Sequence, residues 1–242
     1  MKSQTIDYPM GAMSGEGVLV YDETISGRRP ALLMAPDWLG VTDRAVERAK
    51  LLAGERYVVL VADMYGKGVR PVNFAAAPAH ANPLREDAVE QRRRVRAAYD
   101  ALIGEGSRRN LIDQRRAAVG FCFGGGNVLE LARDGADIAA AGSIHGDLKT
   151  TQPAVPGAVK AALLVAHGAP DPVAPKADRD AFEREMDAAG AKWQMLLFGG
   201  ALHAYTDVEA NMPGVAAWHE PAARQTYTLA HQFIADAFAG RL

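Results

Sequence analysis

The residues Gly120-Phe121-Cys122-Phe123-Gly124 place the only cysteine of the chain between two glycines. This spacing matches Gly-x-nucleophile-x-Gly, a sharp strand-to-helix turn that presents a reactive side chain at the carboxyl edge of a parallel sheet. The backbone N–H groups that follow such a turn point toward the place where an oxyanion develops. The pattern therefore predicts that Cys122 is a nucleophile. The alternative is a small buried hydrophobic residue at a glycine-rich helix start.

An acid and then a histidine follow the cysteine, in the order that this turn requires in hydrolases. The apolar run 161–166 predicts a strand, and Asp171 lies in the turn-rich loop after it. Residues 193–198 predict another strand, and His203 lies in its exit loop. Either residue alone could be an ordinary turn or loop residue. Their order at successive strand ends predicts Asp171 as the orienting acid and His203 as the base for the thiol.

The loop after the buried strand 31–35 should supply the rest of the site. In this kind of site that loop carries a second oxyanion donor, so we expect the N–H of Trp38 or Leu39 to join the N–H of Phe123. Asp37 either tunes Cys122 or serves as a carboxylate of the turn. The other side chains expected at the pocket are Tyr65, His145 and Tyr205, although core packing is the commoner fate of an aromatic residue. His145 precedes the acid in sequence, so it fits the role of base poorly.

Three motifs together resemble the dienelactone hydrolases, which are carboxymethylenebutenolidase-like proteins of the α/β-hydrolase superfamily. They are Gly-Phe-Cys-Phe-Gly-Gly at 120–125, His-Gly-x-x-Asp-Pro at 167–172 and Leu-His-Ala-Tyr at 202–205. The resemblance runs from about residue 15 to the last helix. It implies an α/β-hydrolase fold, with Cys122, Asp171 and His203 as nucleophile, acid and base. It also implies hydrolysis of a small-molecule lactone, enol ester or carboxylic ester through a thioester, without a cofactor.

The chain departs from that family at two places. The family carries a glutamate where this chain has Asp37. It also holds the substrate carboxylate with arginines, one of them a few residues after the histidine, whereas residues 204–207 here read Ala-Tyr-Thr-Asp. We therefore expect neutral or bulkier substrates to be preferred over dienelactone itself. Arg85, near the stretch 66–83, is the nearest candidate for a replacement cation, and the alternative is a solvated arginine at a helix start.

The pattern of elements is that of an α/β protein, with a mostly parallel central sheet and helices on both faces. Apolar runs at 31–35 and 58–62 read as strands buried on both faces. An opening strand is expected at 16–21 and a further strand at 139–144, with helical spacing over 46–53, 84–102, 183–189 and 226–238. Residues 66–83 have no clear periodicity and could form a loop over the pocket. No linker or repeat divides the chain, so we expect residues 1–242 to form a single domain.

Composition narrows the class of partner. A net charge of −2 over 242 residues argues against nucleic acid. The arginines at 92–94 and 96 predict a solvated helix face. The first residues lack the apolar segment of a signal peptide and no run of ~18 apolar residues occurs, which predicts a cytoplasmic protein without a membrane partner. A lone cysteine and scattered histidines predict no metal site. A monomer and a homodimer both remain compatible with the sequence, and the alternatives to an ester hydrolase are a thiol-based redox sensor and a non-catalytic binding protein on the same scaffold.

Overall fold

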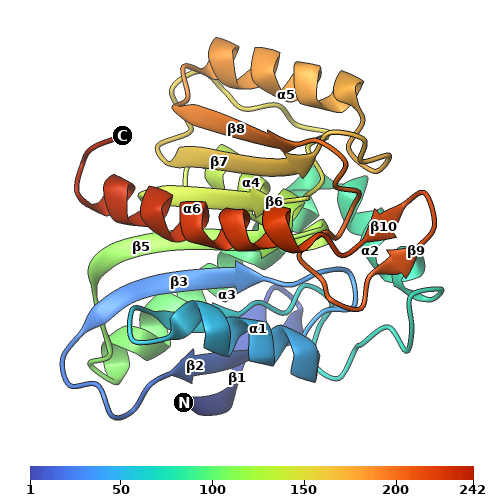
Figure 1. Cartoon of the computed structure of the whole chain (residues 1–242). Coiled ribbons are helices and arrows are strands. Elements are labelled where there is room, and N and C mark those ends of the chain that lie inside the picture. Colours follow the sequence, from blue (N-terminus) through green and yellow to red (C-terminus); the bar gives the residue numbers. More distant parts are fainter.

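A computed structural model describes all residues, 1–242. Its centre is an eight-stranded sheet in the order β1-β2-β4-β3-β5-β6-β7-β8 (Figure 1). The strands from β4 to β8 in this order are parallel, while β1 and β2 are antiparallel to their neighbours. Their bounds are Lys2–Met10 for β1, Met13–Tyr21 for β2, Arg29–Ala35 for β3, Val58–Val61 for β4, Ile112–Phe121 for β5, Ala140–Ile144 for β6, Ala162–Gly168 for β7 and Trp193–Phe198 for β8. The α/β-hydrolase architecture predicted from the sequence is confirmed.

Helices cover both faces of the sheet, as buried parallel strands require. One face packs against α1 (Asp43–Ala53) and α6 (Glu220–Phe238), and the other packs against α3 (Ala88–Arg108), α4 (Phe123–Arg133) and α5 (Lys176–Ala189). Figure 1 shows α1 and α6 in front of the sheet and α3 and α4 behind it. A short hairpin of β9 (Asn211–Met212) and β10 (Ala216–Ala217) stands at the carboxyl edge of the parallel strands.

Two predictions of local structure were wrong. The stretch 66–83 was expected to be a loop, but its last residues belong to α2 (Ala77–Arg85), whose second residue is Pro78, in the first turn, where a helix needs no N–H donor. The apolar residues with helical spacing from 84 to 102 belong to two helices, because the chain leaves the helical conformation at Asp87. The Asp87 side chain accepts the Glu90 N–H and caps the start of α3. The antiparallel edge strand β1 was also not predicted.

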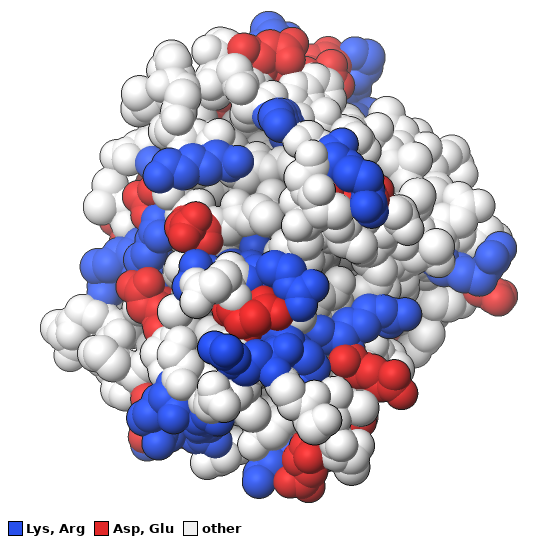
Figure 2. All heavy atoms as spheres, turned by 90° about the vertical axis from the view of Figure 1, so that its left-hand side faces the viewer, with Lys and Arg blue, Asp and Glu red and all other residues white.

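The amino edge of the parallel strands lies opposite the hairpin. On this face, lysine and arginine side chains lie beside aspartates and glutamates (Figure 2). Local ion pairs include Arg115 with Asp113 and Arg241 with Asp236. The surface is therefore a mixture of both signs rather than a field of one sign.

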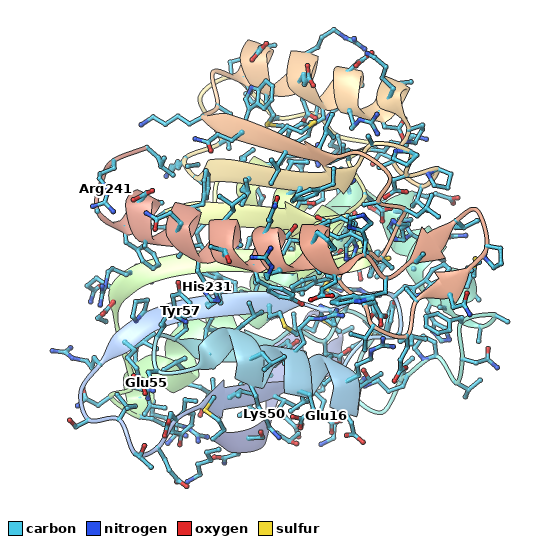
Figure 3. All side chains as sticks on the ribbon, in the orientation of Figure 1. Glu16, Lys50, Glu55, Tyr57, His231 and Arg241 are labelled. Carbon is cyan, nitrogen blue, oxygen red and sulfur yellow. The ribbon has the colours of Figure 1, made fainter.

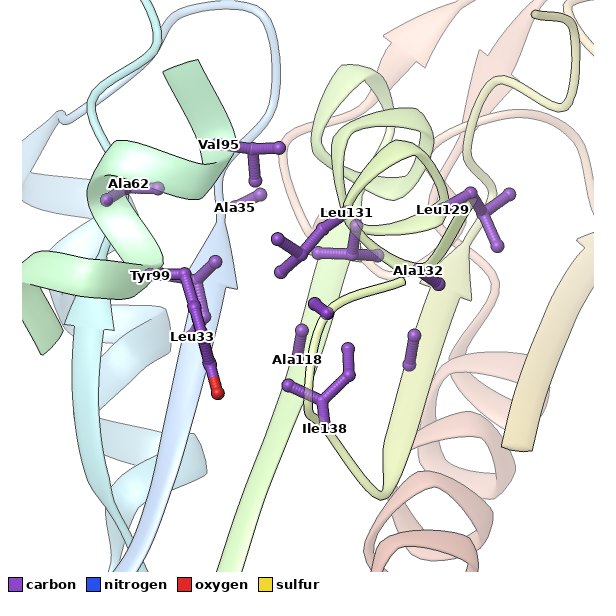
Figure 4. Packing of buried hydrophobic residues seen from close by; sticks show 14 of the residues in the cluster. Leu33, Ala35, Ala62, Val95, Tyr99, Ala118, Leu129, Leu131, Ala132 and Ile138 are labelled. Carbon is purple, nitrogen blue, oxygen red and sulfur yellow. The ribbon is translucent and has the colours of Figure 1, made fainter. Parts of the chain in front are cut away.

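Aromatic and aliphatic contacts attach the helices to the sheet. His231 of α6 stacks on Tyr57, which precedes β4, with ring centroids 5.8 Å apart (Figure 3). On the other face, Leu131 of α4 packs over Ala118 of β5 (Figure 4). Small residues on the strands, such as Ala118, let the helices approach the sheet closely. No helix of the chain is both long and apolar enough to cross a bilayer.

Candidate active site

Cys122 sits at the junction of β5 and α4 in a backbone conformation that L-residues rarely adopt. Its φ is 54° and its ψ is −123°, which costs on the order of 1–3 kcal/mol and persists only where the surroundings enforce it. The enforcing contacts come from hydrogen bonds: the Cys122 N–H points to the carbonyl of Ile144 at 3.0 Å and to Nδ1 of His145 at 3.2 Å. The strained turn predicted from the sequence is thus present in the structure.

Gly120 and Gly124 are required because neighbouring backbone leaves no room for a Cβ atom at either position. Their φ angles alone would not require glycine. A Cβ on Gly120 would overlap the backbone of Gly124, and a Cβ on Gly124 would overlap the carbonyl oxygens of Ala35 and Pro36. The start of α4 can therefore lie directly against the exit of β3. This contact brings the loop that contains Trp38 next to the turn that contains Cys122.

Cys122, His203 and Asp171 are in contact in series. The Nε2 atom of His203 lies 3.1 Å from Cys122 Sγ, and its Nδ1 atom lies 2.9 Å from Asp171 Oδ2. The other carboxylate oxygen, Oδ1, accepts the N–H of Val173 at 2.8 Å. All three members are buried. They come from the exits of β5, β8 and β7, which are far apart in sequence and meet at one edge of the sheet.

The charges of these neighbours shift the pKa values of the acid and the histidine. Burial would raise the pKa of Asp171, but the nearby ring of His167, the hydrogen bond from His203 and the positive charge of His203 hold it below its usual value. Burial would lower the pKa of His203, but negative charge on Cys122 and the hydrogen bonds to Asp171 and Cys122 raise it. The site therefore favours an anionic carboxylate beside an imidazole that readily holds a proton.

His167 is the second histidine that faces this carboxylate. Its Nδ1 atom lies 3.8 Å from Asp171 Oδ2, which is beyond hydrogen-bond distance, and neither ring nitrogen has another partner. Burial is the main reason that the pKa of His167 is lowered. A neutral His167 leaves His203 as the histidine that binds Asp171 directly.

Of the three backbone N–H groups expected as oxyanion donors, two have no acceptor in the protein and the third is already bonded. Phe123 is the first residue of α4, so its N–H has no acceptor within the helix. The N–H of Trp38 has no partner in the protein. The N–H of Leu39, in contrast, donates to Asp37 Oδ1 at 2.9 Å. Of the two donors expected from this loop, the N–H of Trp38 is therefore the one that remains free. Asp37 accepts a hydrogen bond within its own turn, which supports the alternative that it is a carboxylate of the turn.

The other expected pocket residues divide into two groups. His145 lines the cavity over Cys122 together with Asp37. Its Nδ1 atom accepts from Cys122, so its Nε2–H donates to Thr206 Oγ1 at 2.7 Å. Burial and the neighbouring positive charge of His203 hold the pKa of His145 well below its usual value, so it is neutral.

Tyr65 and Tyr205 do not line the cavity, and the expectation for them was wrong. Tyr205 is fully buried, and its hydroxyl pairs with Thr226 Oγ1 at 2.9 Å. Tyr65 lies behind the cavity wall, where its hydroxyl donates to the carbonyl of Trp38 at 2.8 Å and its ring stacks on Phe123. Both tyrosines support the site from the core.

The cavity has a volume of about 200 Å³ and contains side chains that the sequence did not single out. Phe74, from the segment before α2, faces Trp38 with ring centroids 6.4 Å apart. The β9–β10 hairpin supplies Met212 and Val215. No periodic signal marks these residues, because they lie in short irregular segments; the one available hint is that Phe74 is the only aromatic residue between positions 66 and 83. The remaining lining residues are Arg48, Arg85, Val173, Ala204, Asp207, Glu209, Ala210, Asn211 and Ala216.

Most charged side chains at the cavity are engaged by other residues. Arg44, on α1, pairs with both Asp207 and Glu209. Arg85 donates to Asp147 at 2.7 Å, and its guanidinium lies 5.3 Å from the centre of the Phe123 ring. Arg85 therefore reaches the cavity, as its place near the expected pocket-capping loop suggested, but it already has an anionic partner. No three or more His, Cys, Asp or Glu side chains are arranged so that they could hold a metal ion.

The fold and the geometry of the site define the class of protein, which is an α/β-hydrolase. Its strained turn lies between β5 and the N-terminus of α4, and its acid–histidine pair lies at the carboxyl edge of the sheet. The model of the dienelactone hydrolase family matches residues 16–238, and the chain belongs to this family of ester and lactone hydrolases.

Two solved structures and one curated sequence are similar to this chain. A dienelactone hydrolase-like promiscuous phosphotriesterase from metagenomic libraries is 33% identical over 98% of both chains, with a TM-score of 0.90. The protein named m3DLH has the same identity and coverage and a TM-score of 0.89. An uncharacterized protein of Caenorhabditis elegans is 32% identical over 131 residues, which are 52% of this chain and 82% of that protein.

Proposed function

We propose that this protein hydrolyses lactones and activated esters by nucleophilic catalysis, with Cys122 as nucleophile, His203 as base and Asp171 as the acid that orients His203. The observation that carries the proposal is the pair of contacts made by one imidazole, 3.1 Å to Cys122 Sγ and 2.9 Å to Asp171 Oδ2. A histidine held in this way has one nitrogen fixed toward the carboxylate and the other directed at the thiol.

The reaction begins with transfer of the thiol proton to His203 Nε2. The Cys122 sulfur then attacks the substrate carbonyl carbon, and the carbonyl oxygen becomes an anion that accepts hydrogen bonds from the N–H groups of Trp38 and Phe123. Collapse of this intermediate breaks the bond to the leaving oxygen, which takes the proton from His203. The product of this half-reaction is a thioester on Cys122.

Water completes the cycle. His203 accepts a proton from water, the hydroxide adds to the thioester carbonyl, and the thiolate leaves and regains its proton. Thiolate is itself a good leaving group, so an intermediate with a poor leaving group would return to substrate. This favours lactones and enol-type esters over amides.

The geometry also bears on the alternative of a redox sensor. A sensor needs an exposed and reactive cysteine, often with a second cysteine to resolve the oxidised form. Here the only cysteine is 8% exposed and lies beside a histidine–carboxylate pair that oxidation does not require. Hydrolysis uses every part of this arrangement.

The test is the variant Cys122→Ala, assayed with p-nitrophenyl acetate. We expect loss of more than 99% of the activity with an unchanged circular dichroism spectrum, because the change removes the thiol and little core volume. Iodoacetamide at one equivalent should inactivate the wild type, and a slowly turned-over ester should protect it. Retention of more than a few per cent of activity by Cys122→Ala would overturn the assignment.

A further inference from the structure

The wall of the cavity that opens from Cys122 carries large apolar side chains exposed to solvent. Phe74 is 51% exposed, Met212 is 47% exposed and Val173 is 37% exposed. Exposed apolar residues that stand singly are common, but these three and Trp38 line one cavity with Cys122 and His203. A group of this kind at the mouth of a reactive site marks a place where a ligand covers apolar surface.

The apolar side chains come from separate segments of the chain. Trp38 and Phe74 form a tilted aromatic pair on the side of α2. Met212 and Val215 belong to the β9–β10 hairpin. A substituent bound in this cavity would have both aromatic rings and aliphatic groups within reach. The contacts are non-directional, so they select for hydrophobicity and size more than for a particular functional group.

The hairpin is fixed in relation to the reacting atoms. The N–H of His203 donates to the carbonyl of Val215 at 3.0 Å, and the N–H of Ala217 donates to the carbonyl of His203 at 3.2 Å. The apolar wall therefore has a fixed position with respect to His203. A substituent bound at this wall would place its carbonyl carbon in a defined orientation toward Cys122.

The charged side chains at the mouth of the cavity are paired with residues of opposite charge and do not prevent the binding of a hydrophobic substituent. Asp207 and Glu209 are paired with Arg44, and Arg85 is paired with Asp147. Arg48 lies 4.0 Å from Asp37. Apart from Asn211 and the residues around Cys122, the side chains that remain available to a substituent are apolar. At about 200 Å³ the cavity is smaller than the ~300–1,000 Å³ of sites that enclose drug-sized ligands. The size fits a short alkyl chain or a single ring.

We propose that Trp38, Phe74, Met212 and Val215 form a binding site for a hydrophobic substituent, so that the substrates are lactones and esters with a short alkyl chain or one ring. This inference rests on the proposed function, because it places the reacting carbonyl at Cys122. Phe74 and Met212 are then specificity-determining residues and have no part in the chemical step.

Two substrate series test this substrate class with the full-length wild-type enzyme. One runs from p-nitrophenyl acetate to p-nitrophenyl hexanoate, and the other runs from γ-butyrolactone to γ-octalactone. Each methylene that becomes buried is expected to raise kcat/KM by up to about fourfold, from the transfer free energy of ~0.8 kcal/mol per methylene. We expect at least a tenfold rise in one or both series. A flat response in both series would overturn the proposal.

Variants assign the effect to the wall. Phe74→Ser and Met212→Ser should each lower the ratio of kcat/KM for the longest substrate to kcat/KM for acetate at least fivefold. Phe74→Leu, which keeps an apolar side chain, should restore most of the loss. Leu229→Ser is the matched control, since Leu229 is 41% exposed on α6 and lies outside the cavity. A rise with chain length that survives in both serine variants would also overturn the proposal. Failure of the catalytic assignment is a separate outcome, because it appears as acetate hydrolysis by Cys122→Ala.

Discussion

His203 lies between the thiol of Cys122 and the carboxylate of Asp171, and each of them contacts a different ring nitrogen. Asp171 fixes the ring through Nδ1, and Cys122 faces the opposite nitrogen. His145 also lies next to this group, with its ring centroid 5.3 Å from that of His203, but its nitrogens are occupied by the Cys122 N–H and Thr206. Two neighbouring histidines are thus distinguished by their hydrogen bonds, and only His203 has a ring nitrogen bonded to the thiol.

This distinction predicts different kinetic results for the two histidines. His203→Asn should lower kcat by roughly 10²- to 10⁴-fold with little change in KM, because the base is lost and the pocket is kept. His145→Gln should cost much less, since its role is to hold the backbone at Cys122. Steady-state kinetics with p-nitrophenyl acetate measures both. An essential His145 together with a dispensable His203 would show that the assignment of the base is wrong.

Asp171 gives a prediction for stability against pH. Its pKa is held below the usual value in the folded protein, so the ionised group contributes stability above the unfolded-chain pKa of about 3.9. That contribution decreases as the pH falls toward the folded pKa, with a slope of up to about 1.4 kcal/mol per pH unit.

Urea unfolding at pH 5, 4 and 3 measures this contribution. The difference in free energy of unfolding between the wild type and Asp171→Asn should shrink as the pH falls. Asp43→Asn, a change at an exposed carboxylate on α1, serves as the control. A difference that stays constant over this range would contradict the expected sign.

At the scale of elements, the site depends on how closely neighbouring strand exits can approach. Gly168, at the end of β7, faces the loop that leads to His203, and a Cβ there would overlap the carbonyl oxygen of Ala201. Without a side chain at this position, the loop that contains Asp171 and the loop that contains His203 lie in contact. The hydrogen bond between their side chains depends on that contact.

Gly168→Ala should therefore separate the two loops, lower kcat more than tenfold and lower the melting temperature. The matched control is Gly142→Ala in the neighbouring strand β6, where a Cβ would meet only Val119 Cγ2 at 3.6 Å, an ordinary van der Waals distance. Kinetics and thermal unfolding of the two variants provide the comparison. Equal effects in both would mean that the approach of the loops has no special role.

The elements also show which parts of the structure the sequence could predict. The buried parallel strands β3, β4, β6 and β7 were found because each is a short apolar run between turn residues. Helix α2 was missed because prolines and an asparagine interrupt its nine residues. Strand β1 was missed although Ile6, Tyr8 and Met10 alternate with exposed residues, since only three positions of an edge strand carry the pattern.

The order of nucleophile, acid and histidine along the chain was enough to predict which three side chains would meet, because each follows a strand of one parallel sheet. The remaining features of the site depend on side-chain direction, which has no sequence period. Leu39 was expected as a possible donor, but its N–H is bound by Asp37. Tyr205 follows His203 by two residues, yet it points into the core. Arg48 and Phe74 reach the cavity from segments that the motifs do not include.

At the scale of the whole molecule, charge is distributed so that no strong field leads to the site. The net charge is −2, and the amino edge of the sheet carries both signs side by side (Figure 2). The cavity itself contains three acids, Asp37, Asp207 and Glu209, and two arginines, Arg48 and Arg85. Long-range steering of an anionic substrate needs an excess of positive charge near the site, and the chain does not provide it.

The balance of acids and arginines at the cavity predicts how the enzyme treats two forms of dienelactone. The free acid is an anion, and the methyl ester is neutral. The arginine Arg85 is bonded to Asp147, and Arg48 lies 4.0 Å from Asp37, so a substrate carboxylate would have to displace an existing partner. We expect kcat/KM for the methyl ester to exceed that for the free acid, by up to about tenfold, which corresponds to ~1.4 kcal/mol. The variant Asp207→Asn should narrow this preference, because it releases Arg44 from one of its two acidic partners. A clear preference of the wild type for the free acid would mean that Arg48 or Arg85 exchanges its protein partner for the substrate carboxylate.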